Sequence, residues 1–213
     1  MRVITQEEFD NLPTNKYGIK VVPAYSDLTA IQEFPAYCSF GKGCDFGKYC
    51  RFGENCSFSE NCDFGKYCSF GEDCDFAKRC RFGENCDFGE LCSFSENCDF
   101  GKYCSFGEDC DFGKYCRFGE NCDFGELCSF GELCSFSENC KLIELQILNY
   151  KAVDRIGDKK RKLYCWNLEG VLYFQAGCFF GKKDELLKRV DENYGKDSEY
   201  HLAIEFLEKL INR

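Results

Sequence analysis

Apolar and polar residues recur with a six-residue period over almost half of the chain. From Cys38 to Cys140 a cysteine occupies every sixth position, and a phenylalanine follows two residues after each of the first seventeen cysteines. Residues two apart on an extended strand point to the same side, so Cys and Phe are predicted to face inward. The Ser, Asp or Arg between them then faces outward. A period of six does not return to one face of an α-helix, so the pattern predicts a row of short strands.

Glycine and polar residues fill the other half of each hexad. Gly usually follows Phe, then comes Lys or Glu, and then Tyr, Asn, Asp or Leu. This is turn chemistry, because Gly reaches backbone angles that a Cβ forbids. Each hexad is therefore predicted to be a strand and a corner. Stacked coils about 4.8 Å apart bury the apolar sides that an isolated hexad leaves exposed.

The C-x-F-G-x-x pattern resembles the left-handed β-helix hexapeptide-repeat family, whose repeat places a small residue inward and an aliphatic residue two positions later. Cys takes the small position here and Phe takes the large one. The resemblance implies a mostly β fold, a left-handed parallel β-helix with three hexads, or 18 residues, in each triangular coil. The use of Phe implies a wider or differently filled core.

The 18-residue coil groups corner residues into columns. Tyr49, Tyr67 and Tyr103 share one column, and Leu91 and Leu127 share another. All five are predicted to be largely exposed. One interpretation is drift within the repeat, and the other is that they mark an interaction edge.

An internal duplication is also visible. Residues 63–92 and 99–128 differ at two positions and lie 36 residues, or two coils, apart. The segment SFSENC follows the first copy directly, at 93–98. After the second copy an extra hexad, 129–134, comes first, and SFSENC follows it at 135–140. The extra hexad is predicted to move everything after it by a third of a coil.

The repeat phase sets three segments. Residues 26–142 are assigned to the β-helix, because Leu28 and Leu142 keep the phase of the inward positions. Residues 1–25 are predicted to be a cap, with a strand, a helix that begins at Thr5 with a capping box, and a second strand. Residues 143–213 are predicted to be a small α+β domain.

The C-terminal domain is predicted to contain strands at 142–148, 163–166 and 171–175 and helices at 184–193 and after Ser198. In the last helix Leu202, Phe206 and Leu210 lie at i, i+4 and i+8, which suits a dimer, whereas the hexapeptide-repeat resemblance implies a trimer. Six basic residues are candidates for binding a small anion, with a solvated hairpin loop as the alternative for the first four. They are Lys159, Lys160, Arg161, Lys162, Lys182 and Lys183.

The net charge is −10, and the repeat carries all of it. An acidic surface opposes direct binding of nucleic acid, although it can imitate nucleic acid. Lys and Arg interleave with the acids along the sequence, so no face is predicted to be purely anionic. The chain has no apolar run long enough for a membrane span, and its first residues do not read as a signal peptide. These features predict a cytoplasmic protein.

The cysteines do not have the spacing of a metal site. Zinc sites usually show Cys pairs two to four residues apart with a second pair or His behind them, whereas the spacing here is C-x5-C and His201 is the only histidine. The cysteines are therefore predicted to be core thiols. With no metal ligands, no cofactor motif and no general base in the repeat, the sequence predicts a protein that is not an enzyme.

A C-x-F-G array followed by a strand, a turn and a strand that ends in AGCFFG (176–181) resembles uncharacterised proteins encoded by bacteriophages and prophages. The resemblance implies an origin in an infected bacterial host. Because the chain lacks catalytic groups, we expect a non-enzymatic binding or scaffold protein in the host cytoplasm that inhibits a host component of anti-phage defence through protein interaction. Acidic mimicry of nucleic acid is one mechanism. The alternatives are an oligomer that sequesters a signalling nucleotide and a relative of the hexapeptide-repeat acyltransferases, whose catalytic histidine the repeat lacks.

Overall fold

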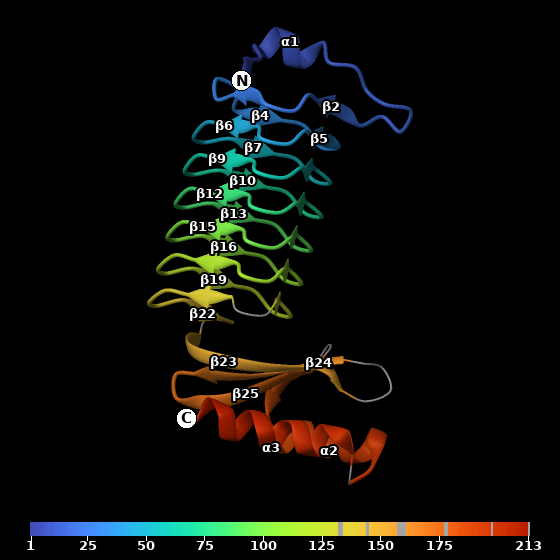
Figure 1. The fold of residues 1–213 in the computed structure, drawn as a ribbon, viewed down its shortest axis with the longest axis vertical. Helices are drawn as coiled ribbons and strands as arrows, with labels where there is room; N and C mark the ends of the chain where they lie inside the picture. Colours follow the sequence, from blue (N-terminus) through green and yellow to red (C-terminus); the bar gives the residue numbers. More distant parts are fainter. Residues whose placement is uncertain (132–133, 144, 157–160, 177–178, 197, 213) are drawn as a thin grey trace. The chain divides into compact units, whose positions relative to one another are not determined.

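The structure, a computed structural model, describes residues 1–131, 134–143, 145–156, 161–176, 179–196 and 198–212, with the backbone alone at 146, 154, 155 and 161. The chain forms two compact units, Met1–Ile143 and Glu144–Arg213 (Figure 1). Among the described residues, no helix is both long enough and apolar enough to cross a membrane.

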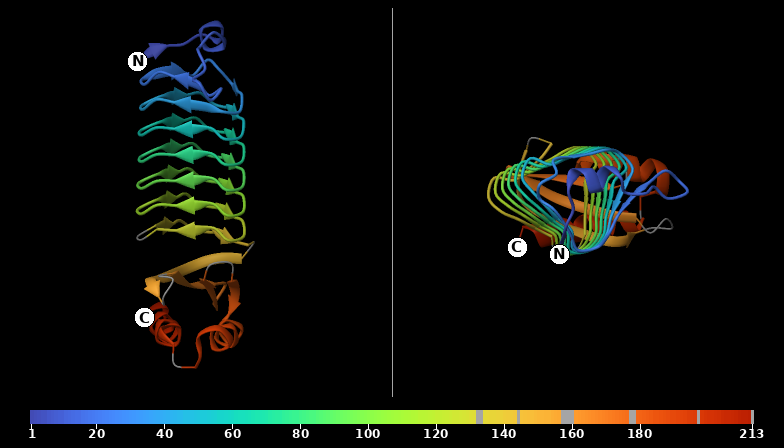
Figure 2. Two further views of the ribbon diagram at one scale, coloured as in Figure 1. Left: turned by 90° about the vertical axis from the view of Figure 1, so that its right-hand side faces the viewer. Right: turned by 90° about the horizontal axis from the view of Figure 1, so that it is seen from above.

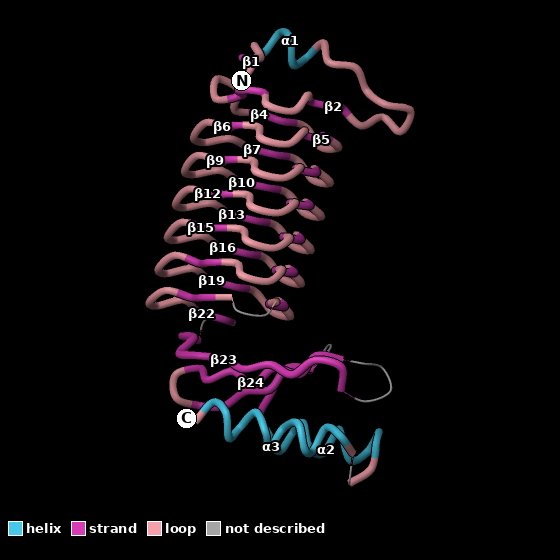
Figure 3. Tube along the Cα trace, in the orientation of Figure 1, coloured by secondary structure: helices cyan, strands magenta, loops and turns pink. Residues whose placement is uncertain are grey.

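The first unit is a parallel β-helix in which short strands alternate with corners (Figure 3). Each repeat strand pairs in parallel with the strand 18 residues before it, as Phe76 pairs with Phe58. Viewed along the axis of this unit, successive coils superpose (Figure 2). The predicted fold class is confirmed: a mostly β parallel solenoid with 18 residues per coil, and a small α+β region after it.

The chain passes through sheets B, A and C in turn. Sheet A contains β1 (Arg2–Val3), β3 (Ser26–Leu28), β6 (Asp45–Phe46), β9 (Asp63–Phe64), β12 (Arg81–Phe82), β15 (Asp99–Phe100), β18 (Arg117–Phe118) and β21 (Ser135–Phe136). Sheet B contains β2 (Lys20–Val22), β5 (Cys38–Phe40), β8 (Ser57–Phe58), β11 (Asp75–Phe76), β14 (Ser93–Phe94), β17 (Asp111–Phe112) and β20 (Ser129–Phe130). Sheet C contains β4 (Glu33–Phe34), β7 (Arg51–Phe52), β10 (Ser69–Phe70), β13 (Asp87–Phe88), β16 (Ser105–Phe106), β19 (Asp123–Phe124) and β22 (Lys141–Leu142).

The consequences predicted for the duplication are confirmed. The two copies begin in β9 and β15, which both belong to sheet A. The SFSENC segment contributes β14 to sheet B at its first occurrence and β21 to sheet A at its second. The extra hexad therefore moves the pattern by one sheet.

Phenylalanine rings fill the β-helix in a repeating arrangement. Within a sheet the rings stack in parallel, as those of Phe52 and Phe70 do at 4.8 Å between centroids. Rings from different sheets meet edge to face, as those of Phe58 and Phe64 do at 5.0 Å and 83°. Offset and edge-to-face contacts each add about 0.5–1.5 kcal/mol beyond the burial of the rings. The core is thus filled differently from an aliphatic one, as predicted.

The array cysteines are buried free thiols, as predicted. Most of these thiols donate a hydrogen bond to the carbonyl oxygen 21 residues earlier in the chain. For example, the Cys98 Sγ lies 3.5 Å from the Ala77 oxygen. Hydrogen bonding to Cys128 and burial together raise the pKa of Cys110 to about 12. The Cys110 thiol therefore packs and bonds inside the core and stays protonated at neutral pH.

The predicted reason for the repeat glycines is wrong. The left-handed backbone conformation occurs at the sixth position of the hexad, where Tyr49, Asn55 and Leu91 have φ of 62°, 56° and 59°. The glycine after Phe is needed for another reason, which is close approach to the preceding coil. A Cβ on Gly107 would lie 2.7 Å from the backbone nitrogen of Glu90, closer than carbon and nitrogen can pack.

The N-terminal residues contain the predicted strand, helix and second strand, and the two strands join sheets A and B of the β-helix. Helix α1 (Gln6–Asp10) begins with a capping box, in which the Thr5 side chain accepts from the Glu8 N–H and the Glu8 carboxylate accepts from the Thr5 N–H. The Phe9 ring meets Phe34 edge to face at 5.2 Å. The helix thereby covers the first phenylalanine of sheet C.

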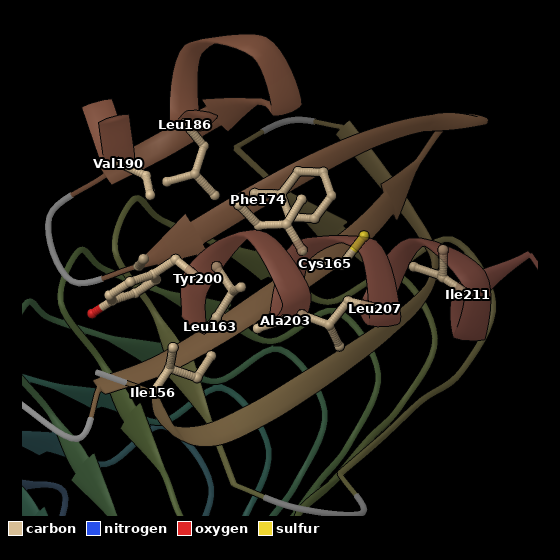
Figure 4. Close-up of a cluster of buried hydrophobic side chains, with 12 residues drawn as sticks. Ile156, Leu163, Cys165, Phe174, Leu186, Val190, Tyr200, Ala203, Leu207 and Ile211 are labelled. Carbon is tan, nitrogen blue, oxygen red and sulfur yellow. The ribbon is translucent and has the colours of Figure 1, made fainter. Parts of the chain in front are cut away.

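The second unit is an antiparallel sheet with two helices on one face. The strands are β23 (Leu145–Ile156), β24 (Arg161–Leu168), β25 (Val171–Ala176) and β26 (Phe179–Lys182), in that order in the sheet. Helix α2 (Lys183–Tyr194) packs on β25 and β26, and α3 (Glu199–Ile211) packs on β23 and β24. Leu163, Phe174 and Leu207 lie in the core between sheet and helices (Figure 4).

Most elements predicted for this unit are confirmed, but the first strand is not. The sequence predicted one strand over 142–148, whereas β22 ends at Leu142 and a separate strand, β23, extends from Leu145 to Ile156. The length of β23 follows from its pairing with β24, which runs from Ile147 opposite Leu168 to Ile156 opposite Arg161. Such long-range pairing is not visible in the local pattern of apolar residues.

Candidate functional site

One corner of the β-helix is purely anionic. It joins sheet C to sheet B and comprises residues 53–55, 71–73, 89–91, 107–109 and 125–127, which we call the acidic edge. The fifth hexad position is glutamate in every one of these coils, and all five glutamates are exposed. They are Glu54, Glu72, Glu90, Glu108 and Glu126. Asp73 and Asp109 extend the same corner and are also exposed.

The backbone holds these residues in line. The N–H groups of Asn55, Asp73 and Leu91 donate to the carbonyl oxygens of the next coil's glutamates, with N···O distances of 2.9, 3.1 and 3.0 Å. The left-handed conformation at these donors turns each N–H toward the next coil. Successive glutamates are therefore spaced by the coil rise, about 4.8 Å.

One of the two neighbouring faces, sheet B, adds acids and no bases. Between Ser39 and Ser129 the outward residues of sheet B are Ser or Asp. Asp75 and Asp111 each accept a hydrogen bond from the serine of the next coil, Ser93 and Ser129. Along these described coils, neither the acidic edge nor the outward row of sheet B contains Lys or Arg.

The other two corners and sheet A pair acids with bases, and on sheet C Arg51 pairs with Glu33 at 3.3 Å. At the corner between sheets A and C, the Lys66 Nζ lies 2.8 Å from a Glu84 carboxylate oxygen. At the corner between sheets B and A, the corresponding Lys78–Glu96 distance is 2.9 Å. On sheet A, the Arg117 guanidinium contacts Asp99 at 2.5 Å.

The prediction that no face is purely anionic is therefore wrong. The prediction considered the charges in chain order, whereas one corner of the β-helix is formed by every third hexad. Reading the fifth position at intervals of 18 from Glu54 finds the acidic edge in the sequence itself.

The charge density of this region approaches that of nucleic acid. Five glutamates and four aspartates of the acidic edge and sheet B span five coils, or about 19 Å at about 4.8 Å per coil. The spacing is about one charge per 2 Å, compared with about one per 1.7 Å of duplex DNA and one per 3.4 Å of a single strand. No cation within the row offsets these charges, so their negative potentials add along it.

The residues predicted to form one interaction edge lie on two corners. Leu91 and Leu127 belong to the acidic edge, whereas Tyr49, Tyr67 and Tyr103 lie at the corner between sheets A and C. The tyrosines were predicted to be largely exposed and are about half exposed, and the rings of Tyr49 and Tyr67 stack at 5.0 Å. Their contact with a partner stays a prediction.

The basic residues predicted to bind an anion are only partly described. Lys159, Lys160 and the side chain of Arg161 lie outside the described part of the chain. The Lys162 Nζ lies 5.6 Å from the centre of the Tyr164 ring, and the Lys183 Nζ lies 2.6 Å from a Glu208 carboxylate oxygen. Lys182 ends β26 opposite Tyr173. The anion site stays a prediction.

The apolar side chains of α3 that were predicted to mediate oligomerisation point outward from the second unit. Leu202 is 71% exposed, Phe206 is 54% exposed and Leu210 is half-buried. The oligomer stays a prediction.

Sequence reasoning missed one arrangement around the single histidine. Ser198 Oγ lies 3.0 Å from His201 Nδ1, and His201 Nε2 lies 2.9 Å from Asp191 Oδ1. Ser198 precedes α3 and Asp191 lies in α2, so the imidazole joins the two helices. Within the described chain, no group of three His, Cys, Asp or Glu side chains is placed to hold a metal ion.

The chain matches no protein-family model, no curated protein and no solved structure. The acidic edge is therefore the main indication of function in this chain.

Proposed function

We propose that the protein is a non-catalytic binding protein that uses the acidic edge to occupy the basic, nucleic-acid-binding surface of a partner protein. The main observation is the unbroken row of glutamates at 54, 72, 90, 108 and 126, with no Lys or Arg in the acidic edge or in the outward row of sheet B along the described coils. The resemblance of the repeat and tail to phage-encoded proteins makes the partner a host protein in this proposal.

The physical basis is electrostatic complementarity. A surface that binds nucleic acid carries Lys and Arg arranged to meet phosphates at regular intervals. A rigid line of carboxylates offers such a surface a comparable charge density without a mobile backbone, so less conformational freedom is lost on binding. The stacked coils provide that rigidity, because each edge residue is hydrogen bonded to the next coil, as Asp73 is to Glu90.

The experiment is a capture from bacterial extract on the immobilised full chain, followed by competition. We expect retained proteins to be released by duplex DNA fragments and by salt, because both act on the charges that the acidic edge supplies. The triple variant Glu72→Lys/Glu90→Lys/Glu108→Lys is expected to retain none of them. Lysine already occupies the fifth position at other corners, such as Lys66 and Lys102, so the fold accommodates it.

The control has the same change in net charge at other corners. It is Glu84→Lys/Glu96→Lys/Glu120→Lys, whose glutamates pair with Lys66, Lys78 and Lys102. Exposed pairs of this kind contribute about 0–1 kcal/mol, so the control is expected to fold and to retain the partner. Equal loss in both variants, or a retained protein that DNA does not displace, would contradict the proposal.

A further inference from the structure

Two leucines interrupt the acids of the acidic edge at a regular interval. Along the sixth hexad position of this corner, Asp73, Leu91, Asp109 and Leu127 succeed one another coil by coil. Leu91 is 50% exposed and Leu127 is half-buried. Their spacing is two coils, or about 10 Å.

A leucine at this position is unfavourable for the isolated protein in two ways. Its backbone is left-handed, with φ of 59° at Leu91 and 58° at Leu127, a conformation that Asn and Asp tolerate better. Its side chain also leaves apolar surface in water between carboxylates. Asn55, at the same corner, avoids both costs. A residue that costs the free protein in this way points to a role in a complex.

We infer that Leu91 and Leu127 are apolar anchors that insert into pockets of a protein partner, between lysines or arginines that meet the flanking carboxylates. The inference rests on the proposed function and names its partner more closely. An apolar centre surrounded by charged groups is the usual anatomy of a protein–protein interface, where a few desolvated side chains supply most of the affinity. A partner that presents charge alone has no contact for the leucines.

The test uses two synthetic peptides with the same number of lysines, one an oligolysine and the other with leucines spaced between the lysines. Binding of each labelled peptide to the full chain is measured by fluorescence anisotropy at two salt concentrations. The variant is Leu91→Asn/Leu127→Asn, which recreates the Gly-Glu-Asn corner found at 53–55. We expect this variant to bind the leucine-containing peptide about tenfold more weakly and to bind oligolysine with unchanged affinity.

The matched control is Tyr67→Asn/Tyr103→Asn, which removes exposed apolar surface from another corner whose column already contains Asn85 and Asn121. It is expected to bind both peptides as the unchanged chain does. If the leucine variant and the unchanged chain bind the leucine-containing peptide with equal affinity, the leucines are not anchors, and the proposed function still stands. Failure of both peptides to bind the unchanged chain, or equal binding to the Glu72→Lys/Glu90→Lys/Glu108→Lys variant, overturns the proposed function and the anchors with it.

Discussion

The backbone N–H of Asp73 donates a 3.1 Å hydrogen bond to the carbonyl oxygen of Glu90, one coil further along the acidic edge. This bond belongs to the ladder that fixes the coil spacing, so the backbones that carry neighbouring glutamates stay about 4.8 Å apart. Like charges are therefore held close together at the acidic edge, at a cost to stability that the mixed corners do not have.

Removing one of these charges is expected to stabilise the fold. Glu90→Gln relieves repulsion from Glu72 and Glu108 and should raise the free energy of unfolding by about 0.5 kcal/mol at low ionic strength, and by less at high salt. Urea denaturation at two salt concentrations measures this. The control, Glu84→Gln, loses its ion pair with Lys66 and should be neutral or destabilised. A gain of the same size in both variants would show that the acidic edge carries no special repulsion.

Alkaline pH is expected to destabilise the array. Hydrogen bonding and burial raise the pKa of Cys92 and of Cys110 to about 12, whereas an unfolded cysteine has a pKa of about 8.5. Above about pH 8.5 the unfolded chain loses protons that the folded chain keeps, so stability is full below that pH and falls as pH rises toward 12. The loss is about 1.4 kcal/mol per pH unit for each thiol.

Because the pKa values of Cys86 and Cys116 are also raised to about 12, we expect the free energy of unfolding to fall between pH 8 and pH 10, as followed by circular dichroism under reducing conditions. The double variant Cys92→Ala/Cys110→Ala should release two fewer protons on unfolding, which the slope of stability against pH reports. A free energy of unfolding that stays constant from pH 8 to pH 10 would contradict this account of the core.

A methyl group on a repeat glycine is expected to force coils apart. Gly107→Ala places a Cβ 2.7 Å from the backbone of Glu90 and should lower the free energy of unfolding by about 2 kcal/mol. The matched variant is Gly113→Ala, because its column already contains Ser59, Ala77 and Ser95. Its cost should be less than half as large. Equal costs in thermal or urea denaturation would mean that the column does not adapt to a side chain.

A hole in the phenylalanine core is expected to be costly and local. The Phe88 ring stacks between Phe70 and Phe106 at 4.8 and 4.9 Å. Phe88→Ala should lower the free energy of unfolding by about 3–5 kcal/mol. Phe136 is half-buried in the last coil of sheet A, so Phe136→Ala should lower the free energy of unfolding by less than half as much. Because each coil contacts only its neighbours, Phe88→Ala should also broaden the urea transition.

Some of the structure follows directly from the sequence. The inward position of Cys and Phe depends only on the two-residue period of a strand, and the 18-residue coil follows from three hexads, so the positions of Cys98 and Phe58 were correctly predicted. The acidic edge was also within reach, since Glu54 and Glu72 lie one coil apart. It was missed because charge was considered along the chain and not down a corner.

Other features depend on contacts between coils or between distant strands. The chain by itself determined the alternation of strand and corner and the identity of the core, because both are set by local geometry. Only the tertiary structure decided why Gly107 must lack a side chain, that Leu91 takes the left-handed conformation, and that β23 extends to Ile156. Each of these is fixed by backbone from another coil or strand, and no local pattern records how closely that backbone approaches.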